Sequence, residues 1–283
     1  MLAELKHSLR RHRGAIIGWS IGIGLYGLMM VSLFSSVTEI EGLEEMIQSY
    51  PPELMAFFGE MVEITTPKGY LDIYYFSYMP LIIGILAIMG GAGLLASDEE
   101  KGILDLVMSH PLSRSGLFWG RLVGITITLV VVLLVGWLSW VIPADSVGMD
   151  LTWVEFLRPF IPLFATLMFY TTMALLLSML LPSSRMAAML TGGILVADFL
   201  LLGLASINDT LEPIVKFLPR NYFQGGQAIA GLNWEWLAGL FGISIIFALL
   251  AWWRFLRRDL SVGGEGGWRL PRLRRKKEQA ATA

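Results

Sequence analysis

The residues best arranged for chemistry lie between Ser97 and Leu122, in the stretch SDEEKGILDLVMSHPLSRSGLFWGRL. Three consecutive acidic residues, Asp98, Glu99 and Glu100, come before apolar residues that repeat at the spacing of one helix face. Charges beside an apolar stripe are suited to docking onto another molecule rather than to making or breaking bonds. We call residues 97–122 the island, because long apolar segments flank it on both sides.

The rest of the sequence contains few residues or motifs that could support catalysis. There is no cysteine, so thiolate metal sites, disulfides and a cysteine nucleophile are excluded. The histidines, His7, His12 and His110, are too scattered to suggest a metal site. No G-x-x-x-x-G-K-[ST] phosphate loop occurs, and the glycines between 263 and 267 lack its lysine. We therefore expect no enzymatic activity, no metal and no cofactor on this chain.

Long apolar segments dominate the sequence outside the island. Hydrophobic residues make up 55% of the chain and charged residues 16%, whereas soluble domains carry about 25% charged residues. A helix needs roughly 20 apolar residues to cross a bilayer, and six segments qualify: 14–34, 73–97, 118–142, 159–182, 186–207 and 236–255. The sequence predicts an all-α integral membrane protein, with one six-span domain over residues 1–260 and a flexible basic tail at 261–283.

The positions of the basic residues predict the orientation in the cell membrane. With both termini in the cytoplasm, 17 of the 21 Lys and Arg residues lie on the cytoplasmic side, as the positive-inside rule requires. Leu2, Leu5 and Leu9 alternate with basic residues before the first span, which is typical of an amphipathic interfacial helix. We expect the tail sequence RLPRLRRKK to contact anionic lipid. Nucleic-acid binding is not expected, because no aromatic residues interleave with these basic residues.

The island itself is expected to contain a cytoplasmic surface helix over residues 97–110. Ser97 and Glu100 fit a capping box at its start, and Pro111 disfavours helix at its end. Ser113 is placed to cap the helix that leads into the third span. Its polar face would gather Asp98, Lys101, Asp105 and Ser109, opposite the apolar face of Ile103, Leu106, Val107 and His110.

Two interpretations of this helix are open. It could lie flat on lipid, with its apolar face inserted. Lipid-bound helices are usually rich in Lys and Arg, however, and anionic lipid would repel the acidic first turn of the island. The acidic turn therefore favours a protein partner.

The pattern E-E-x-G-x-L-x-L-x-x-S-x-P-x-S-R before an apolar helix resembles the permease subunits of type-2 ATP-binding-cassette (ABC) exporters. The residues that carry it are Glu99, Glu100, Gly102, Leu104, Leu106, Ser109, Pro111, Ser113 and Arg114. In that family this segment is the coupling helix, which sits in a cleft of a separate ATPase subunit. The resemblance implies that Ile103, Leu104, Leu106 and Val107 pack in that cleft, and that Glu99, Glu100 and Arg114 make polar contacts there.

Two further features lie within the spans. Asp198 is the only ionisable residue well inside a predicted span; it could line a substrate pathway, or it could be a hydrogen-bonded carboxyl that joins helices. Gly14, Gly18 and Gly22 repeat at four-residue spacing, which allows close approach of another helix. That helix could belong to the same bundle, which we expect, or to a second subunit.

The resemblance predicts a permease that forms half of an export pathway. Its partners would be a second permease subunit, identical or related, and an ABC ATPase that binds ATP and Mg²⁺. One alternative is an ion- or proton-coupled carrier that uses Asp198. Another is a membrane anchor that recruits a cytoplasmic partner without transport. The transported substrate and the residues that contact it are not predictable from this sequence.

Overall fold

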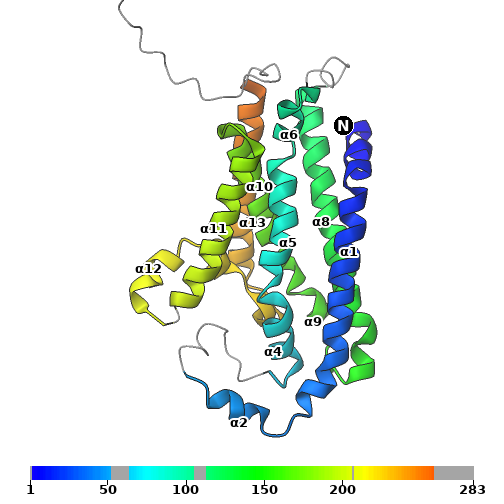
Figure 1. Cartoon of the computed structure of the whole chain (residues 1–283), viewed down its shortest axis with the longest axis vertical. Helices are drawn as coiled ribbons and strands as arrows, with labels where there is room; N and C mark the ends of the chain where they lie inside the picture. The colour runs from blue at the N-terminus through cyan, green and yellow to red at the C-terminus, as the bar shows by residue number, and fades with distance from the viewer. Residues whose placement is uncertain (1, 52–63, 105–112, 206, 258–283) are drawn as a thin grey trace, which may run out of the picture.

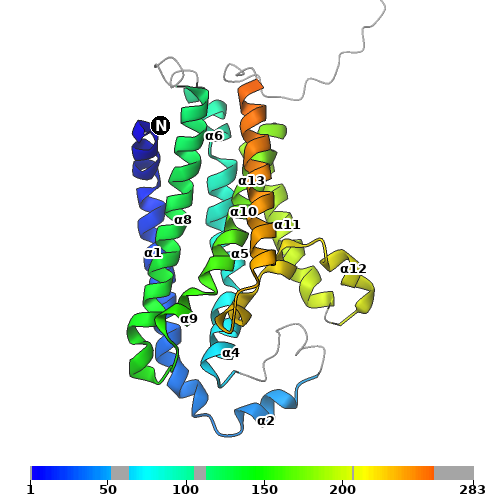
Figure 2. The same cartoon turned by 180° about the vertical axis from the view of Figure 1, so that it is seen from behind.

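The structure is a computed structural model that describes residues 2–51, 64–104, 113–205 and 207–257. Figures 1 and 2 show a bundle of long helices that run along a common axis. Every regular element in the described residues is helical, and six segments are long and apolar enough to cross a membrane. The prediction of an all-α protein with six spans is therefore confirmed.

The six segments follow the predicted apolar stretches in order. They are α1 (Leu2–Thr38), α4 with η2 and α5 (Pro67–Leu71, Asp72–Phe76 and Met79–Ala92), α8 with η3 (Arg114–Ala144 and Asp145–Val147), α9 with α10 (Trp153–Leu157 and Phe160–Leu180), α11 (Ser184–Ala205) and α13 (Trp234–Arg257). The shorter elements are α2 (Leu43–Gln48), α6 (Ala96–Glu100), η4 (Asp209–Leu211), α12 (Glu212–Val215), η5 (Pro219–Tyr222) and η6 (Gly225–Ile229).

Different elements lie at the two ends of the bundle. The N-terminus, α6 and the last turns of α13 lie together at one end, which we call the terminal end (Figure 1). Helices α2, α4 and α9 lie toward the opposite end, which we call the loop end (Figures 1 and 2). The described part of the island, in α6 and the start of α8, therefore lies at the same end as the start of α1 and the end of α13.

Helix α10 is the centre of the bundle. It packs against α5, α11 and α13, whereas α1 packs along α8. In the most apolar stretch of the α9–α10 segment 72% of residues are buried, against 22% for α1 and 22% for α11. Helices α1 and α11 therefore present most of their apolar surface outward, to lipid or to another subunit.

An aromatic cluster forms the core toward the loop end. Tyr75 lies 5.4 Å from Trp140 and 5.6 Å from Phe160 between ring centroids, and Phe76 lies 5.2 Å from Phe160. All four side chains are buried. Such tilted and edge-on aromatic pairs contribute about 0.5–1.5 kcal/mol each beyond the area that they bury. Three spans thereby meet around one cluster.

The N-terminal residues do not form a separate helix. Helix α1 continues without interruption from Leu2 to Thr38, a length of about 55 Å at 1.5 Å per residue. Glu4 and Ser8 are buried, and a side chain added at Gly124 would overlap Ser8, so this part of α1 packs closely on α8. The placement of residues 2–13 in the membrane interface stays a prediction.

The helix packing expected at Gly14, Gly18 and Gly22 does not occur within the described chain. A Cβ added at any of these glycines would meet no atom within 4 Å. The close approach of α1 to α8 occurs instead at Gly27, where a Cβ would overlap Ser139. The expectation of packing inside the bundle is therefore wrong for these three positions, because they face away from α8; packing by a second subunit stays a prediction.

Helices α5 and α10 approach so closely at Gly91 that a single added methyl group is predicted to destabilise the protein. A Cβ at Gly91 would overlap the backbone carbonyl oxygen of Thr171, which cannot rotate away. We expect Gly91→Ala to lower the free energy of unfolding by about 1–3 kcal/mol, as overpacking does, and to lower the thermal unfolding temperature in detergent. Gly192→Ala is the matched control, because a Cβ there meets nothing within 4 Å. Equal unfolding temperatures for the two variants would contradict the close contact.

Candidate functional site

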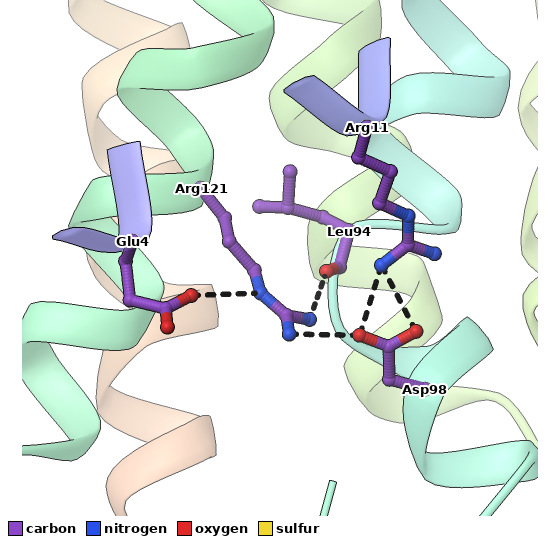
Figure 3. Close-up of polar contacts among 5 residues, drawn as sticks. All are labelled: Glu4, Arg11, Leu94, Asp98 and Arg121. Carbon is purple, nitrogen blue, oxygen red and sulfur yellow. Dashed lines mark hydrogen bonds and ion pairs between the residues drawn. The ribbon is translucent and has the colours of Figure 1, made fainter. Parts of the chain in front are cut away.

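Asp98, from the acidic run of the island, is held between two arginines at the terminal end (Figure 3). Arg11 Nη1 of α1 donates to both of its carboxylate oxygens at 2.9 Å, and Arg121 Nη2 of α8 lies 2.7 Å from Oδ2. Arg121 also donates to the backbone oxygen of Leu94 at 2.8 Å, and its Nε lies 3.8 Å from Glu4 Oε2. This network, which we call the Asp98 network, joins α1, α6 and α8.

Three members of the Asp98 network are buried, whereas the Arg11 side chain is 38% exposed. Asp98 and Arg121 are each 4% exposed and Glu4 is 7% exposed. Charges removed from water must be compensated by partners, because the desolvation of one unpaired ion costs several kcal/mol. Here two guanidinium groups face two carboxylates. Asp98, which was predicted on the polar face of the island helix, faces the interior of the bundle.

Glu100 connects the same segment to a fourth helix. Its carboxylate accepts hydrogen bonds from the backbone N–H of Ser184 and from Ser184 Oγ, the latter at 3.0 Å. Ser184 begins α11, and a carboxylate at a helix N-terminus is favoured by the helix dipole. The predicted capping box is wrong, because Leu95 and not Ser97 is the N-cap residue of α6. Glu100 caps a neighbouring helix instead of its own.

The island helix is interrupted, contrary to the prediction of a continuous helix over 97–110. Helix α6 ends at Glu100, and Gly102 has a φ of 67°, which lies in the left-handed region. Glycine is preferred just after a helix end because a Cβ would be strained there. The chain becomes helical again at Ile103 and Leu104. Gly102 is therefore a joint between α6 and the segment that follows it.

The apolar residues after this joint divide into two groups. Ile103 is 43% exposed, whereas Leu104 is 1% exposed and belongs to a buried cluster with Phe118 and Phe255. Leu104 thus anchors the segment to this chain, and its side chain is not on the surface. The remaining predicted contact residues, Leu106, Val107 and Pro111, lie outside the described residues, as does His110.

The return from the island into α8 is also fixed. Ser113 Oγ accepts from the N–H of Gly116 at 3.1 Å, so the predicted cap of α8 is confirmed. Arg114 Nη1 lies 3.4 Å from the backbone oxygen of Leu256, near the end of α13. Trp252 Nε1 of α13 donates to Ser115 Oγ at 3.2 Å. The first turn of α8 and the last turns of α13 are thereby joined.

Asp198 lies in a second polar site, which is formed by α10, α11 and η5. It is fully buried, and its Oδ2 accepts from the Tyr170 hydroxyl and from the backbone N–H of Arg220, the latter at 3.1 Å. The Arg220 guanidinium donates to the backbone oxygen of Ser77 at 2.8 Å and lies 4.6 Å from the Phe199 ring centroid. This is the geometry of a carboxyl that joins helices, and a role in a substrate pathway stays a prediction.

The electrostatics at this second site keep Arg220 charged. Burial lowers the pKa of the Arg220 guanidinium, and the nearby Asp198 carboxylate opposes that change. A guanidinium starts from a pKa above 12, so it remains a cation in proteins. Among the described residues no group of three or more His, Cys, Asp or Glu side chains gathers to hold a metal.

The sequence did not identify the partners of either carboxyl. From the sequence, Arg11 and Arg121 were counted only as positive charges on the cytoplasmic side. No role was predicted for Tyr170 or Arg220. Arg121 carried one usable signal, because it is a charged residue within the predicted span 118–142. Charged residues at such positions usually face the bundle interior and pair with another group.

The burial of the Asp98 network predicts a large cost for removing one partner. Arg121→Met leaves Asp98 with Arg11 alone and leaves Glu4 without its buried cation. We expect the free energy of unfolding to fall by about 3–5 kcal/mol, measured as a lower thermal unfolding temperature in detergent. Arg10→Met is the matched control, because Arg10 is exposed on the same turn of α1 as Arg11. The network has no structural role if both variants unfold at the same temperature.

The hydrogen bonds of Asp198 predict different outcomes for two substitutions. Asn retains an acceptor oxygen for Tyr170 and Arg220, whereas Leu leaves both buried donors unpaired, at about 1–3 kcal/mol each. We expect Asp198→Leu to unfold at a clearly lower temperature than Asp198→Asn, because Asn removes the charge beside Arg220 but keeps the acceptor for both hydrogen bonds. The joining role is contradicted if the two variants are equally stable.

A comparison with protein families identifies the chain from its sequence as a whole. The family model described as "ABC-2 family transporter protein" matches residues 4–260, a range that includes all of the Asp98 network, Asp198 and nearly all of the six spans. A search of curated proteins found no match. The chain belongs to the ABC-2 transporter family and is a multi-pass permease of the ABC transporter class.

Proposed function

We propose that this chain forms half of the translocation pathway of an ATP-driven exporter, with a second permease subunit and separate ATPase subunits as its partners. Family membership over residues 4–260 supports the transporter class. The sequence contains no phosphate loop, so ATP and Mg²⁺ would be bound by the partner ATPase. Both termini and the island would then face the cytoplasm.

The proposed docking surface for the ATPase begins at Ile103, directly after the joint at Gly102. The exposed side chain of Ile103 supports this placement. Ile103 also follows shortly after α6, which lies at the terminal end with the start of α1 and the end of α13 (Figure 1). Buried Leu104 is left out of the contact surface and would instead hold the docking segment against Phe118. Leu106, Val107 and Arg114 would extend the same surface.

The observation that carries the proposal is the bonding of α6 to three separate spans. Asp98 is paired with Arg11 of α1 and Arg121 of α8, and Glu100 is bonded to Ser184 of α11. A displacement of the docking segment would therefore pull on α1, α8 and α11 together. Closure of the ATPase subunits on ATP would reach the membrane through these bonds.

The outward faces of α1 and α11 support a second permease subunit. Each buries only 22% of its most apolar stretch, and Gly192 and Gly193 of α11 have open space around them. Helices with small residues can approach closely in a membrane. We propose that one of these faces meets the second half.

Ile103→Asp tests the docking surface. A carboxylate placed in an apolar contact should remove a central interaction, and such losses are worth about 2 kcal/mol, or roughly 30-fold in affinity. We expect an affinity-tagged variant to co-purify with much less of the ABC ATPase from the same membranes. Leu2→Asp is the matched control, because Leu2 is also exposed and apolar at the terminal end.

Insertion of both variants is checked by the amount of folded permease recovered after size exclusion. Full ATPase recovery with Ile103→Asp would rule out docking at this surface. Equal losses with Leu2→Asp would show that the effect is not specific to the island.

A further inference from the structure

The surface between α1 and α5 contains two cavities that the proposed function does not use. The first, at the terminal end, has a volume of about 170 Å³. Polar side chains line it from α1, α8 and the segment around α6, namely His7, Ser8, Arg11, His12, Ser97 and Arg121. Four of these six are basic residues, and no acidic side chain of the described residues lines this cavity.

The second cavity is apolar and has a volume of about 500 Å³. Gly14, Gly18 and Gly22 form its α1 side, and Met79 and Ile82 belong to its α5 side. The three glycines have open space around them, so this cavity exists because they carry no side chains. Helices α1 and α5 have almost no direct contact, which leaves this side of α1 open.

The two cavities follow each other along the same pair of helices. The first uses α1 residues 7–12 and the second uses α1 residues 14–26, and α5 and the residues after it supply the other wall of both. From Gly14 to Tyr26 the apolar part spans about 18 Å at 1.5 Å per residue. One bilayer leaflet has a hydrocarbon depth of about 15 Å. A polar, basic end is thus followed by an apolar groove whose length is close to the depth of one leaflet.

The basic end has donors available for an anion. Arg11 uses Nη1 for Asp98, and its other N–H groups have no partner within the described part of the chain. Asp98 and Glu4 compensate the two arginines but line neither cavity. Lys6, Arg10 and Arg13 add positive charge on the same turns of α1. Clusters of this kind next to a span attract anionic lipid.

We infer that the groove between α1 and α5 holds one anionic phospholipid. Its phosphate occupies the cavity at Arg11, His7 and His12, and one acyl chain lies along Gly14, Gly18 and Gly22. The order of basic and apolar lining matches the order of headgroup and chain in a membrane leaflet. This inference does not depend on an ATPase or on export, since it follows from the groove alone.

The test measures lipid bound to the purified full-length chain by native mass spectrometry, after release from nanodiscs of phosphatidylglycerol and phosphatidylcholine in equal amounts. We expect one phosphatidylglycerol to be retained in preference to phosphatidylcholine. Arg11→Gln should weaken that preference about fivefold, since one basic residue near an anionic lipid contributes about 1 kcal/mol. Gly18→Leu should abolish retention, because the leucine side chain fills the groove.

Two matched controls separate lipid binding from damage to the fold. Gly192→Leu places the same side chain on the open face of α11, and Arg185→Gln removes an exposed cation in the first turn of α11 that lines neither cavity. Both should retain the lipid. Equal retention of the two lipids, or retention by Gly18→Leu, would overturn the inference. A change of oligomeric state in Gly18→Leu, measured by light scattering with lipid retention unchanged, would assign the groove to a second copy instead.

Discussion

The pairing of Asp98 with Arg11 and Arg121 is the interaction on which the terminal end depends. Glu4, Asp98 and Arg121 are buried there, and an unpaired charge among them is costly because the interior does not solvate an isolated ion, whereas Arg11 pairs with Asp98 from the surface. This requirement fixes the start of α1, the short helix α6 and the first turns of α8 relative to one another. Glu4 contacts Arg121 and Arg11 contacts Asp98, so the helical start of α1 brings two residues about two turns apart to the same network.

Much of the fold was predictable because it follows from local properties. The length of the apolar segments sets the number of spans, and a serine before an apolar run caps the next helix, as Ser113 does. The break in the island was not predictable from periodicity, because Ile103, Leu106 and Val107 fit one helix face whether or not the helix is interrupted. Gly102 was the available signal, since glycine after a short helix commonly adopts a left-handed conformation.

The candidate site was predictable in its residue types but not in its pairings. The acidic run marked the correct segment, yet Asp98 bonds to Arg11, 87 residues away, and Glu100 to Ser184, 84 residues away. Single-sequence patterns contain no information on such distant partners. The prediction that Gly14, Gly18 and Gly22 pack inside the bundle was wrong for a related reason. Four-residue spacing creates a flat helix face, and only the position of the neighbouring helices decides whether another helix, a lipid chain or no protein atom occupies it.

The two polar sites have a common consequence for α11. Only 22% of the most apolar stretch of α11 is buried, so apolar packing holds this helix weakly. Glu100 bonds to its first residue, and Asp198, about 21 Å further along at 1.5 Å per residue, bonds to Tyr170 and Arg220. Polar contacts at its first residue and about two-thirds of the way along therefore position a helix that has little apolar burial of its own. A shift of α6 would be passed along α11 to Arg220, which also contacts Ser77 just before α5, and so from the terminal end toward the loop end of the bundle.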